Sequence, residues 1–105
     1  MTTVRIANTV HDYESWQEAF DKFERFRDDH GVRSYRIARQ VSDPSEVTID
    51  LEFGSLAEAE SFVPLLARIW STPQSQDQLV SHQAPTILDE VRHRVLEPGA
   101  PATVS

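Results

Sequence analysis

The segment from Val32 to Gly54 constrains the fold most strongly, because it contains two strand-like runs joined by a turn. In the turn from Asp43 to Glu46, the carboxylate of Asp43 can cap the backbone and Pro44 sets the φ angle that the turn requires. After the turn, apolar residues alternate with polar ones, which is the period of a strand with one buried face. The apolar residues are Val47, Ile49, Leu51 and Phe53, and the polar residues are Thr48, Asp50 and Glu52.

A strand followed by a helix is predicted before this hairpin. The strand runs from Val4 to His11, and Asn8 is a polar residue on its otherwise apolar side. Asp12 stands at an N-cap position, and Gly31 is a good helix stop because glycine adopts the left-handed conformation at little cost. Between them, aromatic residues at spacings of three and four predict one amphipathic helix. These residues are Tyr13, Trp16, Phe20, Phe23 and Phe26.

A second helix is predicted after the hairpin, whose strands are expected at Val32–Val41 and Glu46–Phe53. Ser55 and Glu58 form a capping box that starts this helix. Pro64 lacks a donor and clashes with the preceding turn, so it should divide the helix into two short segments that meet at an angle.

The remaining elements are a short helix and a last strand. Thr72 and Pro73 are expected to open one or two helical turns that reach Leu79. A connector from Gln83 to Pro85 precedes a strand predicted from Thr86 to about Val95.

The resulting order, β-α-β-β-α-β, is the split βαβ pattern of an α+β, ferredoxin-like sheet with both main helices on one face. We expect the other face to be an apolar and aromatic patch larger than soluble monomers tolerate. A second copy packed sheet against sheet would cover it, which predicts a homodimeric α/β barrel.

Length, charge and composition narrow the possible partners. We expect a single domain over residues 1–96 and a flexible tail over residues 97–105, where proline and glycine accumulate. The net charge of −7 argues against nucleic-acid binding. No apolar run approaches a membrane span, and no secretory signal is visible. The absence of cysteine excludes disulfides and fits the cytoplasm.

The stretches DYESWQEAFDKFERFRDDHGVRSYRI and DPSEVTIDLEFGSLAEAESF resemble small dimeric α/β-barrel proteins related to antibiotic-biosynthesis monooxygenases and aromatic polyketide cyclases. The resemblance covers about Val4–Phe62 and, weakly, Pro73–Val91, and it includes the step from Arg27 to Gly31. It implies a dimer with a pocket between the sheet and the helices of each subunit. It also implies cofactor-free monooxygenase, cyclase or haem-degrading activity, although the histidine and polar set of the haem-degrading branch cannot be mapped onto this chain. Between Phe62 and Pro73 the chain carries extra residues where the related proteins have a short link. The resemblance therefore does not indicate the shape of the substrate.

Several ionisable residues are candidates for acid–base chemistry. A carboxylate whose pKa is raised by burial, or a histidine, can transfer protons near neutral pH. The candidate catalytic residues are His11, Asp50, Glu52 and His82. The alternative for the carboxylates is an ion pair, for example of Arg5 with Asp50 or Glu52, at the dimer interface. No histidine spacing suits a metal, so neither a metal nor another cofactor is expected.

Candidate substrate-binding residues come from the aromatic stripe, the polar strand face and the extra segment. The alternative for the aromatic residues is a place in the core. The candidates are Tyr13, Trp16, Arg36, Phe62 and Trp70.

These residues favour a small biosynthetic enzyme of secondary metabolism, a cyclase or isomerase that acts by acid–base chemistry on an aromatic or polyketide-like substrate. The alternatives are a cofactor-independent monooxygenase of the same substrate class and a non-catalytic dimer that binds a small apolar ligand. A buried carboxylate or histidine facing an enclosed cavity would favour an enzyme. A cavity filled by Trp70 and Phe62, with every charge paired, would favour a structural module.

Overall fold

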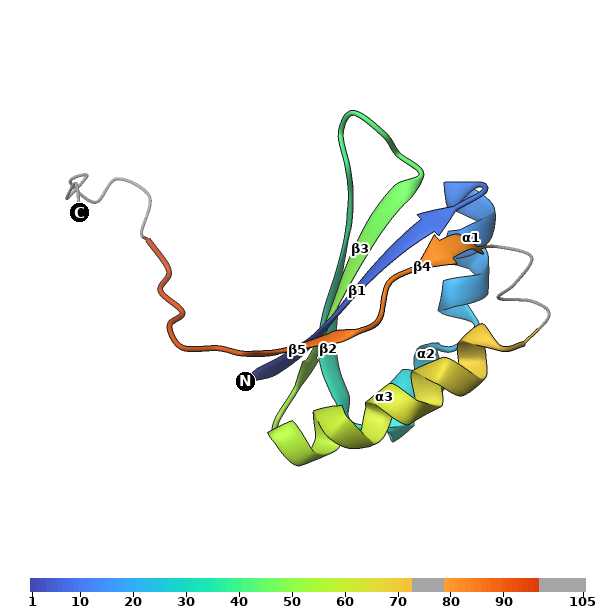
Figure 1. The fold of residues 1–105 in the computed structure, drawn as a ribbon. Helices are drawn as coiled ribbons and strands as arrows, with labels where there is room; N and C mark the ends of the chain where they lie inside the picture. Colours follow the sequence, from blue (N-terminus) through green and yellow to red (C-terminus); the bar gives the residue numbers. More distant parts are fainter. Residues whose placement is uncertain (73–78, 97–105) are drawn as a thin grey trace.

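An antiparallel sheet whose helices all pack on one face forms the core of the molecule (Figure 1). The computed structural model describes residues 1–72 and 79–96 of the 105-residue chain. The sheet order is β2-β3-β1-β4, and β5 pairs with the part of β1 that β4 leaves free. This arrangement confirms the predicted α+β, ferredoxin-like fold. The elements are β1 (Thr2–Val10), α1 (Tyr13–Asp21), α2 (Glu24–Asp29), β2 (Val32–Arg39), β3 (Glu46–Phe53), α3 (Leu56–Trp70), β4 (Leu79–His82) and β5 (Thr86–Asp89).

The two central strands, β1 and β3, carry the apolar core on the side that faces the helices. Directly paired residues share one face of a sheet, and the register aligns Ile6 with Ile49 and Arg5 with Asp50. The first pair is buried in the core, whereas the second lies on the open face. The predicted division of the strands into an apolar and a polar side is therefore confirmed. The fully buried side chains of the core include Val4, Val10, Val47, Leu51, Phe53 and Phe62.

The predicted caps and turn form as the sequence indicates. Asp12 accepts a hydrogen bond from the backbone of Ser15 at 2.9 Å, and Ser55 accepts one from the backbone of Glu58 at 3.2 Å. Gly31 ends α2 with a φ of 91°, and a β-carbon there would lie 2.6 Å from a carboxylate oxygen of Glu58. The positive φ favours glycine at this position, whereas the carboxylate of Glu58 is the end of a flexible side chain that can move aside.

The first helical region is interrupted, which the sequence analysis did not anticipate. Helix α1 ends at Asp21, and α2 begins at Glu24 with Phe23 as its N-cap residue. The backbone amide of Phe23 donates to the carbonyl of Phe20 at 3.1 Å, so the chain tightens to an i to i+3 turn here. No glycine or proline marks the break, so the local sequence carries no signal for it.

The predicted division of the second helix at Pro64 is wrong. Helix α3 continues from Leu56 to Trp70 with Pro64 in its interior. Phe62 and Leu66, on either side of the proline, are both buried against the sheet, whereas Pro64 and Glu60 are exposed. The carbonyl of Glu60 that loses its donor therefore faces solvent, and burial of the apolar face holds the helix together.

The C-terminal strand is shorter than predicted, and an additional strand precedes it. Strand β4 was not predicted, and β5 stops at Asp89 instead of continuing to about Val95. Strand β5 pairs with Thr2–Arg5 of β1, and beyond it the amide of Glu90 donates to the carbonyl of Met1 at 3.2 Å. Residues 91–96 are exposed and run on without regular structure.

The open face of the sheet is polar, which corrects the expectation of an apolar and aromatic patch. On β1 and β3 the residues of this face are charged or carry hydroxyl groups, with Ala7 as the exception. They are Thr3, Arg5, Ala7, Thr9, Glu46, Thr48, Asp50 and Glu52. The most exposed large apolar side chains lie elsewhere, at the β2–β3 turn and near the C-terminus; they include Val41, Val91, Val95 and Leu96.

Some predictions fall outside the described residues. These are most of the short helix expected after Thr72, over residues 73–78, and the tail expected over residues 97–105. Within the described ranges, no helix is long and apolar enough to cross a membrane. Nor do three or more histidine, aspartate or glutamate side chains of that part of the chain gather where they could hold a metal ion.

Candidate functional site

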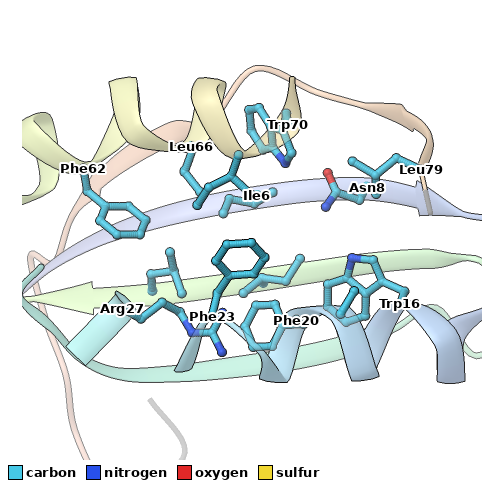
Figure 2. Close-up of a pocket in the computed structure, with 14 residues that line it drawn as sticks. Ile6, Asn8, Trp16, Phe20, Phe23, Arg27, Phe62, Leu66, Trp70 and Leu79 are labelled. Atoms are coloured by element: carbon cyan, nitrogen blue, oxygen red, sulfur yellow. The ribbon is translucent and has the colours of Figure 1, made fainter. Parts of the chain in front are cut away.

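A cavity of about 80 Å³ lies between the sheet and the helices (Figure 2). One water molecule needs roughly 10–15 Å³, so this space admits a small organic group. Every helix described and the strands β1, β3 and β4 contribute to its wall. The chain has two tryptophans and both line the cavity. The aromatic part of the wall consists of Trp16, Phe20, Phe23, Phe62 and Trp70.

The helical spacing of the aromatic stripe explains how these rings reach one cavity. Trp16 and Phe20 are four residues apart on α1, and their ring centroids are 5.1 Å apart. On α3, Phe62 packs on Phe53 of the sheet with centroids 5.4 Å apart. Trp70, at the end of α3, is half-buried beside the cavity. The rings therefore serve the core and the cavity wall at the same time.

Asn8 is a buried polar residue in this otherwise largely apolar wall. It lies in the middle of β1 and its side chain points to the cavity side of the sheet (Figure 2). The residue is 5% exposed, and its Oδ1 atom has no hydrogen-bond partner among the described residues. A buried acceptor without a partner costs about 1–3 kcal/mol. Such an atom beside a cavity is a natural contact for a donor group of a ligand.

Arg27 of α2 is the second buried polar residue of the wall, and it is 6% exposed. Its guanidinium carbon lies 3.6 Å from the ring centroid of Phe20, and Nη2 donates to Glu24 at 3.1 Å. Its Nε atom is buried and has no acceptor in residues 1–72 and 79–96. The arginine is therefore held by stacking and by one ion pair, while one of its donors is left unsatisfied.

The partner of Arg27, Glu24, is itself fixed by a second donor. The hydroxyl group of Tyr35 donates to Glu24 at 2.7 Å. This hydrogen bond and the one from Arg27 hold the pKa of the Glu24 carboxyl below its ordinary value. The same contact with Glu24 raises the pKa of Tyr35. Glu24 therefore stays ionised and keeps the guanidinium of Arg27 oriented.

Asp50, predicted as a catalytic carboxylate, lies on the other face of the sheet and is paired there. Its carboxylate accepts two hydrogen bonds from Arg5, at 2.9 and 3.0 Å, and one from Arg36 at 3.2 Å. The hydrogen bond from Arg5 is the main reason why the pKa of Asp50 is lowered, although partial burial opposes it. An acid–base role would need a raised pKa, so the contacts favour the ion-pair alternative for this residue.

Two other predicted catalytic residues, Glu52 and His11, do not line the cavity. Glu52 lies on the open face, where it accepts a hydrogen bond from Thr3 at 2.8 Å. His11 is exposed in the loop after β1. The backbone of His82 ends β4 and pairs with Asn8 in the register, and the prediction for its side chain lies outside the described part of the structure. None of the described cavity-lining residues is a carboxylic acid or a histidine.

The predicted substrate-binding residues divide between the cavity and the rest of the molecule. Trp16, Phe62 and Trp70 line the cavity. Tyr13 packs against the core beside Trp16 and lies under the guanidinium of Arg39, whose carbon is 4.3 Å from the tyrosine centroid. Arg36 lies on the open face with Asp50.

The sequence analysis did not propose Asn8 and Arg27 as site residues, although each leaves a signal. Asn8 interrupts the apolar side of a strand. Arg27 lies at helical spacing from Phe20 and Phe23, so it belongs to the aromatic stripe rather than to the charged face. In both cases the signal is a polar residue where the periodicity calls for an apolar one.

Comparison with known proteins identifies structural neighbours only. Neither a protein-family model nor a curated protein sequence matches the chain. A solved antibiotic biosynthesis monooxygenase superposes with a TM-score of 0.54 at 14% identity, over 88% of this chain and all of the other. A protein of Deinococcus radiodurans assigned to the same class has a TM-score of 0.58 at 9% identity, over 93% of this chain and all of its own. One of Nitrosomonas europaea has a TM-score of 0.52 at 14% identity, over 88% of this chain and all of its own. The chain therefore shares the ferredoxin-like fold of these proteins.

Proposed function

We propose that the protein is a cofactor-independent monooxygenase of secondary metabolism that oxidises a small, electron-rich aromatic substrate in the cavity between sheet and helices. The observation that carries this proposal is the cavity itself: a space of about 80 Å³ with an aromatic wall and two polar atoms that have no partner in the described part of the chain. A largely apolar pocket with few placed polar groups is the usual form of a small-molecule site. The names of the structural neighbours also favour oxygenation.

Oxygenation fits the described wall better than the cyclase or isomerase chemistry favoured by the sequence. Cyclisation by acid–base catalysis needs a protein group that takes and returns a proton at the substrate. Asp50 and Glu52, the carboxylates considered for that role, lie on the opposite face of the sheet. An electron-rich phenolate can react with O₂ directly when water is kept away, and an aromatic wall provides such surroundings.

The proposed reaction is balanced with O₂ as the only co-reactant. A ring carbon of the phenolate forms a C–O bond with O₂, which gives a hydroperoxide. The O–O bond then breaks as the same carbon loses its proton, and one oxygen remains as the carbonyl of a quinone. The other oxygen leaves as water with the phenol proton and the ring proton, so that the substrate loses four electrons to O₂. In this scheme Trp16, Phe62 and Trp70 hold the ring and exclude water.

Oxygen consumption with a panel of naphthols and dihydroxynaphthalenes tests the activity. We expect one O₂ consumed per quinone formed, and quenching of the fluorescence of Trp16 and Trp70 when the substrate binds. Turnover that continues without O₂ would contradict oxygenation and favour the cyclase alternative. Binding without turnover across the panel would favour the non-catalytic binding protein.

Two alanine variants test whether the cavity is the site. Ala19 lines the cavity, whereas Ala57 is exposed on α3. Ala19→Trp should fill the space and remove both ligand quenching and turnover, and Ala57→Trp should change neither. Equal activity of the two variants would place the site elsewhere.

We also propose that the protein is a cytoplasmic homodimer. The support is the absence of cysteine and the exposure of Val91, Val95 and Leu96, each 75% exposed or more, which a second copy could cover. The ionic network on the open face can be accommodated at such an interface, because Asp50 is already paired within its own chain. Sedimentation of the purified protein tests the assembly, and a single subunit at micromolar concentration would contradict it.

A further inference from the structure

The guanidinium of Arg27 has an unused donor beside the cavity. Nη2 is occupied by Glu24 and the flat face by Phe20, but the buried Nε has no acceptor among the described residues. An N–H group left unsatisfied in the interior is destabilising unless something completes its hydrogen bond. Arg27 lines the cavity and also a polar hollow beside Val32 and Tyr35, and an occupant of the cavity can supply the missing acceptor.

The chemistry of this donor restricts the occupant. Arginine only donates hydrogen bonds, and it remains charged under all physiological conditions. The wall around it is otherwise apolar and aromatic, so an acceptor that carries a negative charge gains most from the contact. The negative charge of Glu24 does not remove the preference for an anion. The side chain of Glu24 is 59% exposed and screened by solvent, whereas that of Arg27 is 7% exposed.

We infer that the cavity selects an aromatic ligand with an ionised oxygen, the phenolate or enolate of an acidic hydroxyarene, and seats this oxygen on Nε of Arg27. The inference rests on the proposed function and names its substrate class more closely. Arg27 is then a specificity-determining residue that touches the ligand.

Asn8 completes the recognition at a second point. Figure 2 places Asn8 and Arg27 on different sides of the group of cavity residues, with the ring of Phe23 between them in the view. Oδ1 of Asn8 accepts hydrogen bonds, so its counterpart on the ligand is a donor such as a neutral hydroxyl group. The favoured ligand therefore carries one ionised oxygen and one hydroxyl group on a planar ring system.

An ionised ligand also removes the need for a base in the wall. None of the described lining residues is a carboxylic acid or histidine. A sufficiently acidic hydroxyarene loses its proton to water before it binds, and Arg27 then stabilises the anion. The titratable groups that contact Arg27 are Glu24 on the same helix and Tyr35 on β2, and neither is part of the cavity wall.

A matched pair of probes tests the inference on the unmodified protein. Para-nitrophenol and its methyl ether, para-nitroanisole, are of similar size, but only the phenol can ionise. Tryptophan quenching measures the affinity of each, and the visible absorption of nitrophenolate reports the ionisation state of the bound phenol. We expect the phenolate to bind about 10–100-fold more tightly than the ether, as expected for one charge-assisted hydrogen bond. The bound phenol should also ionise at lower pH than the free phenol.

The outcomes separate this inference from the proposed function. If the phenol and the ether bind equally, the inference is overturned and the aromatic site stands. If neither probe binds, both proposals fail.

Two arginines of the same short helix provide the matched variants. Arg27→Gln should lose the preference for the phenolate and keep the affinity for the ether, and Arg27→Lys should retain part of the preference. Arg25 is the control, because its side chain is 92% exposed and only pairs with Asp29 at 3.8 Å. Arg25→Gln should behave as the wild type.

Retention of the full phenolate preference by Arg27→Gln would overturn the role of this arginine. Circular dichroism shows whether this variant folds. If it does not, the probe pair on the wild-type protein decides the question.

Discussion

The two faces of the sheet differ in whether their polar groups have hydrogen-bond partners. On the open face, Asp50 accepts three hydrogen bonds from Arg5 and Arg36, and Glu52 accepts one from Thr3. On the helix face the polar groups are fewer, but Asn8 Oδ1 and Arg27 Nε are buried and find no partner within the part of the chain that the structure describes. The face richer in charge is therefore the better satisfied one.

The difference indicates where function should be sought. A satisfied network stabilises the fold and leaves no group free for a ligand, whereas an unpartnered polar atom in an apolar wall is a cost that the fold alone does not recover. A search for charged residues alone would place the functional site at Asp50 and Glu52. Examining which polar atoms lack partners points to Asn8 and Arg27.

The largest effect is expected from the apolar face. Phe62 is 1% exposed and packs on Phe53 and Phe26, so Phe62→Ala should lower the free energy of unfolding by about 3–5 kcal/mol. Urea denaturation measures this change in the free energy of unfolding. Leu56→Ala on the same helix is the control, since Leu56 is 53% exposed and its loss should change stability by about 0.5 kcal/mol or less. Similar losses for both variants would mean that Phe62 does not anchor α3.

Removal of the central charge of the open face should have an intermediate effect. Asp50→Asn should lower the free energy of unfolding by about 1–3 kcal/mol, because its hydrogen bonds with Arg5 and Arg36 lose their charge assistance. The binding of aromatic probes should not change, since Asp50 does not line the cavity. Loss of binding or turnover in a folded Asp50→Asn protein would return this residue to the site.

The pH dependence of stability follows from the ion pair of Asp50 with Arg5. The pKa of Asp50 is lowered in the folded protein, chiefly by the hydrogen bond from Arg5, so its stabilising contribution is complete above the unfolded pKa of about 3.9. That contribution should be lost as the pH falls from about 3.9 through the folded pKa. Denaturation of the wild type and Asp50→Asn at a series of pH values should therefore give curves that converge in acid. A difference that is independent of pH would exclude the ion pair as its source.

The smallest effects are expected from a pair of substitutions with opposite signs. Asn8 and Thr3 are both on β1 and are 5% and 9% exposed. Asn8→Leu removes an unpartnered acceptor and should raise the free energy of unfolding by up to about 1 kcal/mol, while it weakens ligand binding. Thr3→Val removes the donor to Glu52 and should lower the free energy of unfolding by about 0.5–1.5 kcal/mol without effect on binding. If thermal denaturation shows that both substitutions change stability in the same direction, the proposed difference between the two faces is wrong.

Much of the fold could be predicted because its signals are local. The alternation from Val47 to Phe53, the caps at Asp12 and Ser55 and the stop at Gly31 each depend on neighbouring residues, and each forms as predicted. The errors lie where distant contacts override local preference. Burial of Phe62 and Leu66 carries α3 through Pro64, and pairing with Thr2–Arg5 of β1 places β5 at Thr86–Asp89.

The sequence by itself determined the order of the elements from β1 to α3, apart from the break between α1 and α2. It also determined the division of each central strand into an apolar and a polar side, because side-chain periodicity is a property of the backbone geometry alone. It also named three of the cavity-lining aromatic residues, Trp16, Phe62 and Trp70. Only the tertiary structure decided which polar atoms found partners, because partnership depends on residues distant in the chain. Arg5 meets Asp50 forty-five positions away, and no such partner meets Nε of Arg27 in the described residues.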